Sequence, residues 1–306
     1  MPTLQSAGQP AAAFSNLAGF WLSLSGSALL ATNFVTAKYG LSGLDVPTFS
    51  FIWAVAAAAL SAVVIVVTGH WREIFQVDAR TLAALSLVGL LTGAGMILTW
   101  TGLSTLDPSL AAFLMRFTPL MAIALGVIFL KDRFGRLELV GVGMMVAGSL
   151  LSAAGRWGAV GPGMVYCLLA CAAIAGQTFI CKLAAGSCHT MVLVFYRSAG
   201  GALMVGLWTL TSGGANFDAP ASYHLVTVLG ALVSPVLGQL LLFRSYLHWD
   251  FSRSMVVYTS QPLFVAVLAH AFLDRWPDAQ ALAGGALILA GAFWFSWLNA
   301  GRSARV

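Results

Sequence analysis

The stretch DPSLAAFLMRFTPL, residues 107–120, has a counterpart in DFSRSMVVYTSQPL, residues 250–263, which lies 143 residues further along the chain. Asp107 matches Asp250, Ser109 matches Ser252, and the Pro-Leu pair of each stretch falls at the same place. The same offset, to within one residue, relates four more pairs: Gly141 with Gly284, Gly148 with Gly291, Asn33 with Gln177, and Lys38 with Lys182. A fixed period of this kind indicates an internal repeat. The sequence therefore predicts two copies of one unit, joined near residues 156–158.

The composition places both copies in a membrane. Of the 306 residues, 59% are hydrophobic and only 8% are charged, and the mean hydropathy is +0.90. A soluble domain carries roughly a quarter charged residues and a disordered chain needs the opposite composition, so both classes are excluded. Apolar runs between breakers predict an all-α polytopic membrane protein with ten transmembrane helices, at about 17–37, 47–68, 81–104, 108–130, 135–155, 160–182, 189–211, 222–247, 252–273 and 279–299.

The number of helices in each copy determines how the copies are related. Five is odd, so the second copy must enter the membrane from the side opposite to the first. The predicted organisation is a tail at 1–16, a five-helix repeat at 17–155, an inverted five-helix repeat at 158–299 and a tail at 300–306. Inverted repeats give secondary transporters two alternative facings around a midplane site, so the sequence favours a transporter that works by alternating access.

The basic residues predict the orientation. If the N-terminus is cytoplasmic, nine Lys and Arg residues fall on the cytoplasmic side: Arg72, Arg80, Lys131, Arg133, Arg136, Lys182, Arg253, Arg302 and Arg305. Three fall on the far side: Lys38, Arg156 and Arg275. This positive-inside bias predicts that both termini are cytoplasmic. It also accounts for the net charge of +5 without a nucleic-acid partner, because the basic residues are scattered singly along the chain.

A duplicated set of motifs carries a family resemblance. The set consists of the helix end from Asn33 to Lys38, FTPL at 117–120, KDR at 131–133 followed by Glu138, and the helix with Gly141 and Gly148. With this set repeated in the second half, the chain resembles the drug/metabolite transporter superfamily, specifically its EamA-type ten-helix branch. Two features depart from the pattern: Asp274-Arg275 lies one position short of the usual acidic residue before the tenth helix, and Arg197 stands where the first copy has Trp53.

The resemblance implies a location and an activity. It implies a multi-pass protein of the bacterial inner membrane, with a cavity bordered by helices 1, 3, 4, 6, 8 and 9. It also implies export of amino acids and related small metabolites, the aromatic amino-acid exporters being one such branch.

Two arginines, Arg116 and Arg197, lie near the middle of predicted spans, where a charge costs about 2.5–3.5 kcal/mol. All ten acidic residues fall in loops or at helix ends, so neither arginine has an obvious carboxylate partner inside the membrane. Either the arginines bind backbone carbonyls freed by prolines or glycines, or one of them attracts a substrate carboxylate in a watery cavity.

Other polar and aromatic residues are candidates for the same cavity. Lys38 and Lys182 occupy equivalent helix ends, where they either anchor the helices at the interface or meet an anionic group at each mouth. Four amides suit the carboxylate and amino group of a zwitterion, and the alternative is that they join helices by hydrogen bonds. The four amides and two aromatic candidates are Asn33, Gln177, Gln239, Gln261, Trp100 and Tyr258.

Two prolines are candidates for hinges. Pro119 and Pro262 are expected near the centres of their helices, where each leaves the carbonyl four residues earlier, that of Met115 or Tyr258, without its helical donor. Such a kink either bends at a defined place during transport or statically improves packing.

Missing motifs separate the function classes. The sequence has no Walker A, HExxH or GxSxG motif, and its four cysteines (Cys167, Cys171, Cys181, Cys188) have no histidine at metal-ligand spacing. We therefore expect no enzyme activity, metal or cofactor. The expected partners are a small-molecule substrate and the lipid bilayer, with no nucleic acid and no ATPase subunit, and a monomer suffices. A membrane enzyme or a structural subunit is the alternative from a different class.

The same inventory limits the substrate. Spans that offer cations and amides but no anion disfavour organic cations, which usually need a carboxylate or an aromatic cage. Amino acids with large apolar or aromatic side chains fit better, because apolar walls reward burial of such groups at roughly 25 cal/mol per Å². Broad efflux of amphipathic drugs is the alternative, since the same apolar walls would suffice for it.

Overall fold

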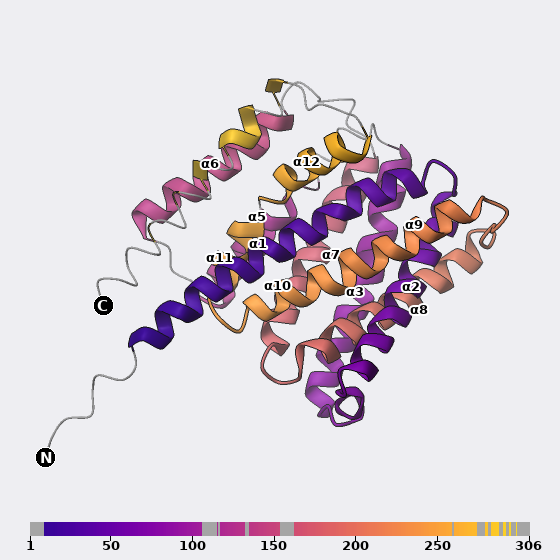
Figure 1. The fold of residues 1–306 in the computed structure, drawn as a ribbon, viewed down its shortest axis with the longest axis horizontal. Helices are drawn as coiled ribbons and strands as arrows, with labels where there is room; N and C mark the ends of the chain where they lie inside the picture. Colours follow the sequence, from indigo (N-terminus) through magenta and orange to yellow (C-terminus); the bar gives the residue numbers. More distant parts are fainter. Residues whose placement is uncertain are drawn as a thin grey trace, which may run out of the picture.

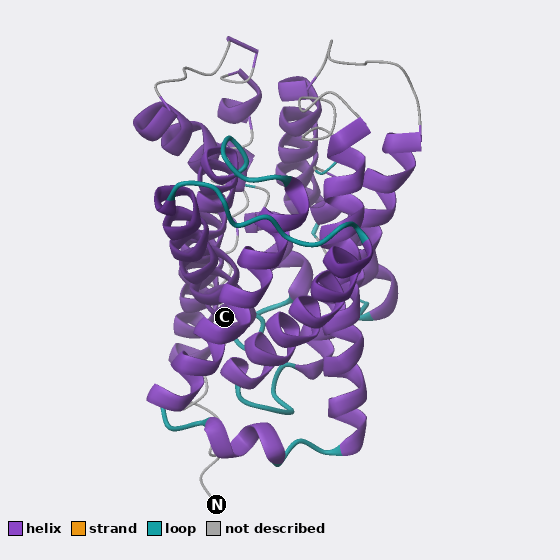
Figure 2. Cartoon of the chain, turned by 90° about the vertical axis from the view of Figure 1, so that its right-hand side faces the viewer, coloured by secondary structure: helices purple, strands orange, loops and turns teal. Residues whose placement is uncertain are grey.

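The computed structural model describes residues 9–105, 115, 117–131, 135–153, 162–258 and 260–273, and beyond them 279–280, 283–287, 290–291, 294 and 298. Every regular element in these ranges is a helix (Figure 2). The first half contains α1 (Gln9–Gly40), α2 (Val46–Val67), the 3-10 helix η1 (Trp71–Phe75), α3 (Ala79–Thr105), α5 (Phe117–Phe129) and α6 (Arg136–Ala153). The second half contains α7 (Pro162–Ala184), α8 (Thr190–Thr211), α9 (Ala221–Ala231), the π-helix η2 (Leu232–Gly238), α10 (Gln239–Ser245), α11 (Phe251–Tyr258) and α12 (Gln261–Leu273).

Within the described ranges, seven helical segments are long and apolar enough to cross a bilayer. They are Leu17–Gly40, Val46–Val67, Ala79–Gly102, Pro162–Ala184, Thr190–Thr211, Ala221–Ser245 and Arg253–Phe272. Each overlaps one of the ten spans expected from the sequence. The remaining three expected spans, 108–130, 135–155 and 279–299, lie partly outside the described residues and stay predictions.

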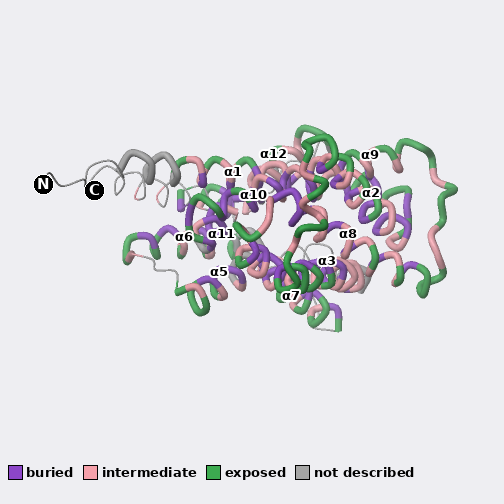
Figure 3. Tube along the Cα trace, turned by 90° about the horizontal axis from the view of Figure 1, so that it is seen from below, coloured by how far each residue is buried: buried purple, intermediate pink, exposed green. Residues whose placement is uncertain are grey.

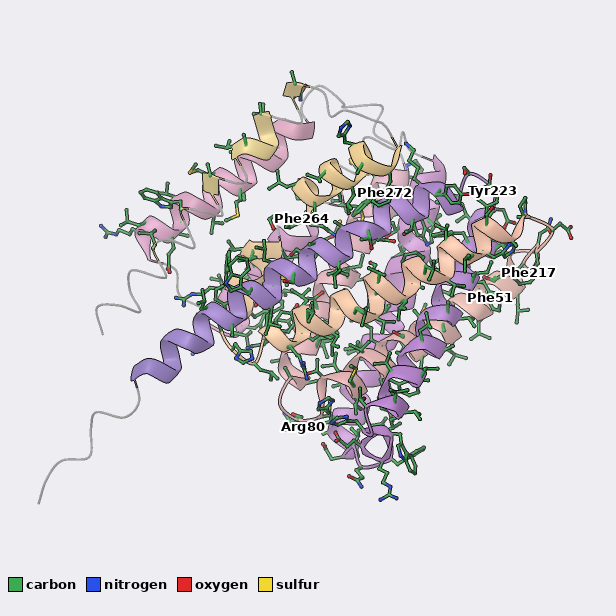
Figure 4. The ribbon with its side chains drawn as sticks, viewed as in Figure 1. Phe51, Arg80, Phe217, Tyr223, Phe264 and Phe272 are labelled. Atoms are coloured by element: carbon green, nitrogen blue, oxygen red, sulfur yellow. The ribbon has the colours of Figure 1, made fainter. Side chains whose placement is uncertain are left out.

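Loops 41–45 and 212–220 meet at one end of the bundle, called the Tyr223 end. Tyr39 and Tyr223 have ring centroids 5.1 Å apart, and the backbone N–H of Asn216 donates to Thr48 Oγ1 at 2.8 Å. Phe51, Phe217 and Tyr223 gather at this end in Figure 4, whereas Arg80 lies apart from them.

Loops 69–78 and 185–189 meet at the opposite end, called the His70 end. The rings of His70 and His189 are stacked with centroids 3.8 Å apart. Loop 246–250 also lies here, because Lys182 at the end of α7 contacts the backbone of Tyr246 and Trp249.

The long helices of the two halves interlock (Figure 1). The third helix of the first half, α3, packs along α7 and α8, and the matching stretch α9–η2–α10 packs along α1 and α2. Between the halves, α2 contacts α8 and α5 contacts α11. The repeat offset pairs α1 with α7, yet α1 ends at the Tyr223 end and α7 ends at the His70 end. Exchanging the halves therefore reproduces the same set of helix contacts with reversed helix direction.

The outward faces of the helices are apolar and the seams between them are closely packed. Figure 3 shows exposed residues along the outer sides of the helices and buried residues where helices meet. Large apolar side chains such as Val63, Leu203 and Phe272 are more than half exposed, as expected for surfaces that face lipid. Small residues allow close helix contact, which is how bilayer-embedded helices associate.

Glycines set the separation of α3 and α8. A Cβ atom built on Gly89 would lie 2.7 Å from the Cα atom of Gly200, and one built on Gly291 would lie 2.7 Å from the carbonyl oxygen of Gly141. In both cases the neighbour is backbone, which cannot rotate away. Close approach of this kind is how small residues let helices in a bilayer associate.

We predict that Gly89→Ala destabilises the protein by about 1–3 kcal/mol, because the added methyl group forces the α3 and α8 backbones apart. The measurement is the thermal unfolding midpoint in detergent. Gly206→Ala on α8 is the matched control, since its Cβ would meet only Phe51 Cε2 at an ordinary 3.8 Å. Equal midpoints for the two variants would show that the α3–α8 seam tolerates a wider separation.

Candidate functional site

Arg197 lies where α7, α8 and the segments around α10 and α11 converge. Its electrostatic neighbours are Cys181 on α7, Tyr246 just after α10 and Tyr258 at the end of α11. The Nε atom is buried without a hydrogen-bond partner, and among the described residues no carbonyl or carboxylate binds the guanidinium. The described part of the chain therefore contains no freed backbone carbonyl that binds the Arg197 Nε–H.

Three amide side chains of the second half are wholly or partly buried. Gln177 is 1% exposed and its Nε2 donates to Cys181 Sγ at 3.5 Å, so this amide is engaged within α7. Gln239, at the first position of α10, has a buried Oε1 that accepts no hydrogen bond from the described residues. Gln261 opens α12 and is 9% exposed. A cation and an unused amide acceptor are complementary to a carboxylate and an amino group, respectively.

The helix that carries Gln239 is interrupted at its centre. Residues 232–238 form a π-helix with Pro235 inside it, and the Ser234 hydroxyl lies 3.5 Å from the Leu30 carbonyl oxygen on α1. A Cβ on Gly238 would meet Leu30 at 3.0 Å, so α1 packs directly against the interruption. Sequence reasoning missed this feature, although a proline inside the apolar run 222–247 was a visible signal. π-helical turns in helices frequently occur at functional sites.

The two candidate hinge prolines lie next to residues outside the described ranges. Pro262 was expected mid-helix, but α11 ends at Tyr258 and α12 begins at Gln261, so Pro262 is the second residue of a new helix. A first-turn residue needs no helical N–H partner, and proline is tolerated there. For Pro119, residues 106–114 and 116 lie outside the described ranges, so its expected mid-helix position stays a prediction. The side chains of both prolines lie outside the described parts, as does Arg116 entirely.

The two equivalent lysines have different environments. Lys182 Nζ donates to the carbonyl oxygens of Tyr246 at 2.5 Å and Trp249 at 3.3 Å, so it caps the end of α10. Lys38 is exposed near the end of α1, at the Tyr223 end. Lys182 is thus tied to the protein backbone, whereas Lys38 sits as an interfacial anchor would.

Trp100 and Asn33 lie apart from the Arg197 group. Trp100 on α3 packs edge-on against Phe49, with ring centroids 5.7 Å apart, and its buried indole N–H has no partner among the described residues. With four other residues it lines a cavity of about 140 Å³: Val46, Pro47, Thr101 and Trp208. Trp208 is eleven residues after Arg197, or about 16 Å along α8, so this cavity lies nearer the Tyr223 end. Asn33 is half-buried on α1.

An ion pair joins the two halves at the His70 end. Glu138, at the start of α6, is fully buried, and its carboxylate lies 3.5 Å from Arg253 Nη2 at the start of α11. Arg253 also reaches Asp250 at 3.3 Å, and the Gly135 N–H donates to Glu138 Oε2 at 2.6 Å. The charges of this pair compensate one another, which makes the burial of Glu138 tolerable.

The loops of the His70 end contain two groups with shifted pKa values. His189 caps α8, with Nδ1 accepting from the Met191 N–H at 3.3 Å. Burial, and next the neighbouring His70, lower the pKa of His189 below its ordinary value, against the opposing effect of Glu73. Hydrogen bonds from Thr81 lower the pKa of Asp78, which caps α3. Neutral imidazole and ionised carboxylate are thus the forms that cap these two helices.

The seven span-length apolar helices among the described residues indicate a multi-pass membrane protein. The family model described as EamA-like transporter family matches the chain twice, over residues 17–154 and 161–297. The chain therefore belongs to the EamA-like transporter family, and its repeated architecture fits that family. The match confirms the resemblance to drug/metabolite transporters and makes the protein a transporter of small molecules rather than an enzyme.

Two further similarities agree with this assignment. A Sinorhizobium sp protein named "Uncharacterized transporter in cobO 3'region" is 31% identical over 134 residues, which cover 44% of this chain and 94% of that protein. A solved structure titled "Crystal structure of protein" has a TM-score of 0.73 at 14% identity, covering 92% of this chain and 97% of its own. The second similarity supports the fold alone.

We predict that stability falls with acidification through the titration of His189. Its pKa is lowered in the folded protein, so its contribution is complete above the ordinary imidazole pKa of about 6.5 and is lost as the pH falls toward the lower folded value. His189→Asn keeps a capping acceptor and does not titrate, so its unfolding midpoint should fall less between pH 7.5 and 5 than that of the parent protein. Parallel profiles for the two proteins would show that another group dominates.

Proposed function

We propose that this protein exports amino acids, preferably those with large apolar or aromatic side chains, by alternating access. The observation that carries the proposal is the Nε atom of Arg197, which is buried and has no hydrogen-bond partner among the described residues. A cation without a partner at membrane depth is costly and marks a substrate pathway by default. A substrate carboxylate supplies the missing charge and accepts two parallel N–H bonds from a guanidinium.

The surroundings of Arg197 support the rest of the substrate. The unused Oε1 of Gln239 is an acceptor for an ammonium group. Phe243, Tyr246 and Tyr258 supply aromatic surface near the cation, and burial of an apolar side chain against it is worth roughly 25 cal/mol per Å². The other predicted residues remain candidates for contacts with the substrate along its route: Gln177, Lys182, Gln261, Asn33, Lys38, Trp100 and Arg116.

We further propose ten helices in two inverted five-helix repeats, 17–155 and 158–299, with both termini cytoplasmic in a bacterial inner membrane. The opposite directions of α1 and α7 support the inversion. The distribution of cations supports the orientation: the His70 end carries Arg72, Arg80, Arg136, Lys182 and Arg253, whereas Lys38 lies at the Tyr223 end. By the positive-inside rule the His70 end is then cytoplasmic.

We predict saturable flux of phenylalanine or methionine when the purified protein is reconstituted into liposomes and tested with labelled amino acids. Arg197→Gln should reduce uptake of the best substrate by at least tenfold at subsaturating concentration, because the charge that binds the carboxylate is gone. Arg244→Gln is the matched control, since Arg244 is exposed and faces away from the interior. Flux of cationic dyes without amino-acid flux would instead establish drug efflux.

We predict that Pro119→Ala and Pro262→Ala slow transport more than they weaken phenylalanine binding. Pro262 follows the interruption between α11 and α12, and removal of its ring lets the two helices join into one that bends less readily. Initial transport rates and binding measured by tryptophan fluorescence separate the two effects. Pro220→Ala in the loop before α9 is the control. Parental rates in both variants would reduce the prolines to packing features.

A further inference from the structure

Tyr246 is a buried side chain that the sequence patterns gave no reason to select. It directly follows α10, is 2% exposed, and its hydroxyl has no hydrogen-bond partner among the described residues. A buried hydroxyl without a hydrogen-bond partner costs roughly 1–3 kcal/mol. A bound ligand that accepts this hydrogen bond would remove the cost. Tyr246 is also one of the few groups that interact electrostatically with Arg197.

The position of the Tyr246 ring is fixed from several sides. Its ring centroid lies 5.7 Å from that of Phe243 on α10 and 5.3 Å from that of Phe251 on α11. Its backbone carbonyl accepts a hydrogen bond from Lys182 Nζ at 2.5 Å. Since a tyrosine has only two side-chain torsions, a held backbone and a clamped ring define where the hydroxyl lies. The hydroxyl is therefore a preorganised donor.

Two unpaired donors on helix segments that contact each other, α8 and the end of α10, specify the charge of the missing partner. The Arg197 Nε–H and the Tyr246 O–H are both buried without an acceptor in the described part of the chain. All ten acidic residues of the sequence lie in loops or at helix ends, so the chain has no mid-span carboxylate to supply. The acceptor that suits a guanidinium and a phenol together is a carboxylate brought by the ligand.

We propose that Tyr246 and Arg197 form one carboxylate-binding site, and that Lys182 is a positioning residue that acts through the Tyr246 carbonyl. The inference rests on the proposed function and narrows its substrate class to solutes that carry a carboxylate next to an apolar group. It also gives Lys182 a role that differs from contact with an anion at the mouth of the cavity. The pair of donors favours a carboxylate over an amide, whose oxygen also accepts hydrogen bonds but carries no charge for the guanidinium, and over a protonated amine, which accepts none.

Binding of a matched pair of small probes tests the site without reference to transport. Phenylacetate and phenylacetamide have the same apolar body and differ in the carboxylate, and their binding to the detergent-purified protein is measured by tryptophan fluorescence. The parent protein should bind phenylacetate at least tenfold more tightly. Tyr246→Phe should lower that ratio about tenfold with little change in phenylacetamide binding, whereas Tyr39→Phe, at the exposed Tyr223 end, should leave the ratio unchanged.

A double-mutant cycle identifies a shared site. If Tyr246 and Arg197 bind the same group, Tyr246→Phe combined with Arg197→Gln should lower the ratio by less than the product of the single effects. Lys182→Met should lower the ratio in the parent and leave it unchanged in Tyr246→Phe, and Lys182→Arg should restore it. A merely structural lysine would weaken both probes equally.

The results that overturn the proposal differ from those that overturn amino-acid export. A parent protein with no preference for phenylacetate, or a Tyr246→Phe variant with the parental ratio, contradicts the carboxylate site. A normal dependence of phenylacetate binding on Tyr246 and Arg197 supports the site even if no amino acid is transported in liposomes. Transport of amino acids with the parental ratio in Tyr246→Phe would leave the proposed function standing and remove this site from it.

Discussion

The hydrocarbon core of a membrane contains no water to satisfy a polar group, and this constraint organises the whole molecule. In the described part of the chain, the outward faces are apolar and the helical backbone groups pair within their own helices. Among the described residues, the π-helix η2 interrupts a long helix in a second-half segment that packs against α1. Where a polar side chain remains unpaired in such a setting, as at Arg197 and Tyr246, a ligand is the natural source of its partner.

The two halves have related helix packing but different side chains at corresponding positions. The second half supplies Arg197, and the position related to it by the repeat is occupied by Trp53, which is 6% exposed and packs against Phe49. Pro235 interrupts its helix, while its counterpart Thr92 sits in a regular stretch of α3 beside Gly93. The two halves therefore share related helix contacts but differ in the side chains at corresponding positions.

The two ends of the bundle differ in the same way. The ion pair between Glu138 and Arg253 fastens the start of α6 to the start of α11 at the His70 end. The positions related to them by the offset of 143 residues are Ala281 and Leu110, which have no charge to form a corresponding pair. The stacked His70 and His189 add a second contact between loops at this end. The sequence repeat therefore does not carry the charges of this ion pair to the corresponding positions of the other half.

The sequence alone determined the class of the protein and its repeat, because hydropathy, spacing and composition are properties of each segment by itself. Seven expected spans and the EamA-type resemblance were confirmed on that basis. The partners of individual polar groups were decided only by tertiary packing. Lys182 binds the carbonyl of Tyr246, a residue 64 positions away, and no local pattern distinguishes this lysine from Lys38. Tyr246 became a candidate only when its hydroxyl was found buried and unpaired near Arg197, because such a state depends on the surrounding helices and not on the residue's own neighbours in the chain.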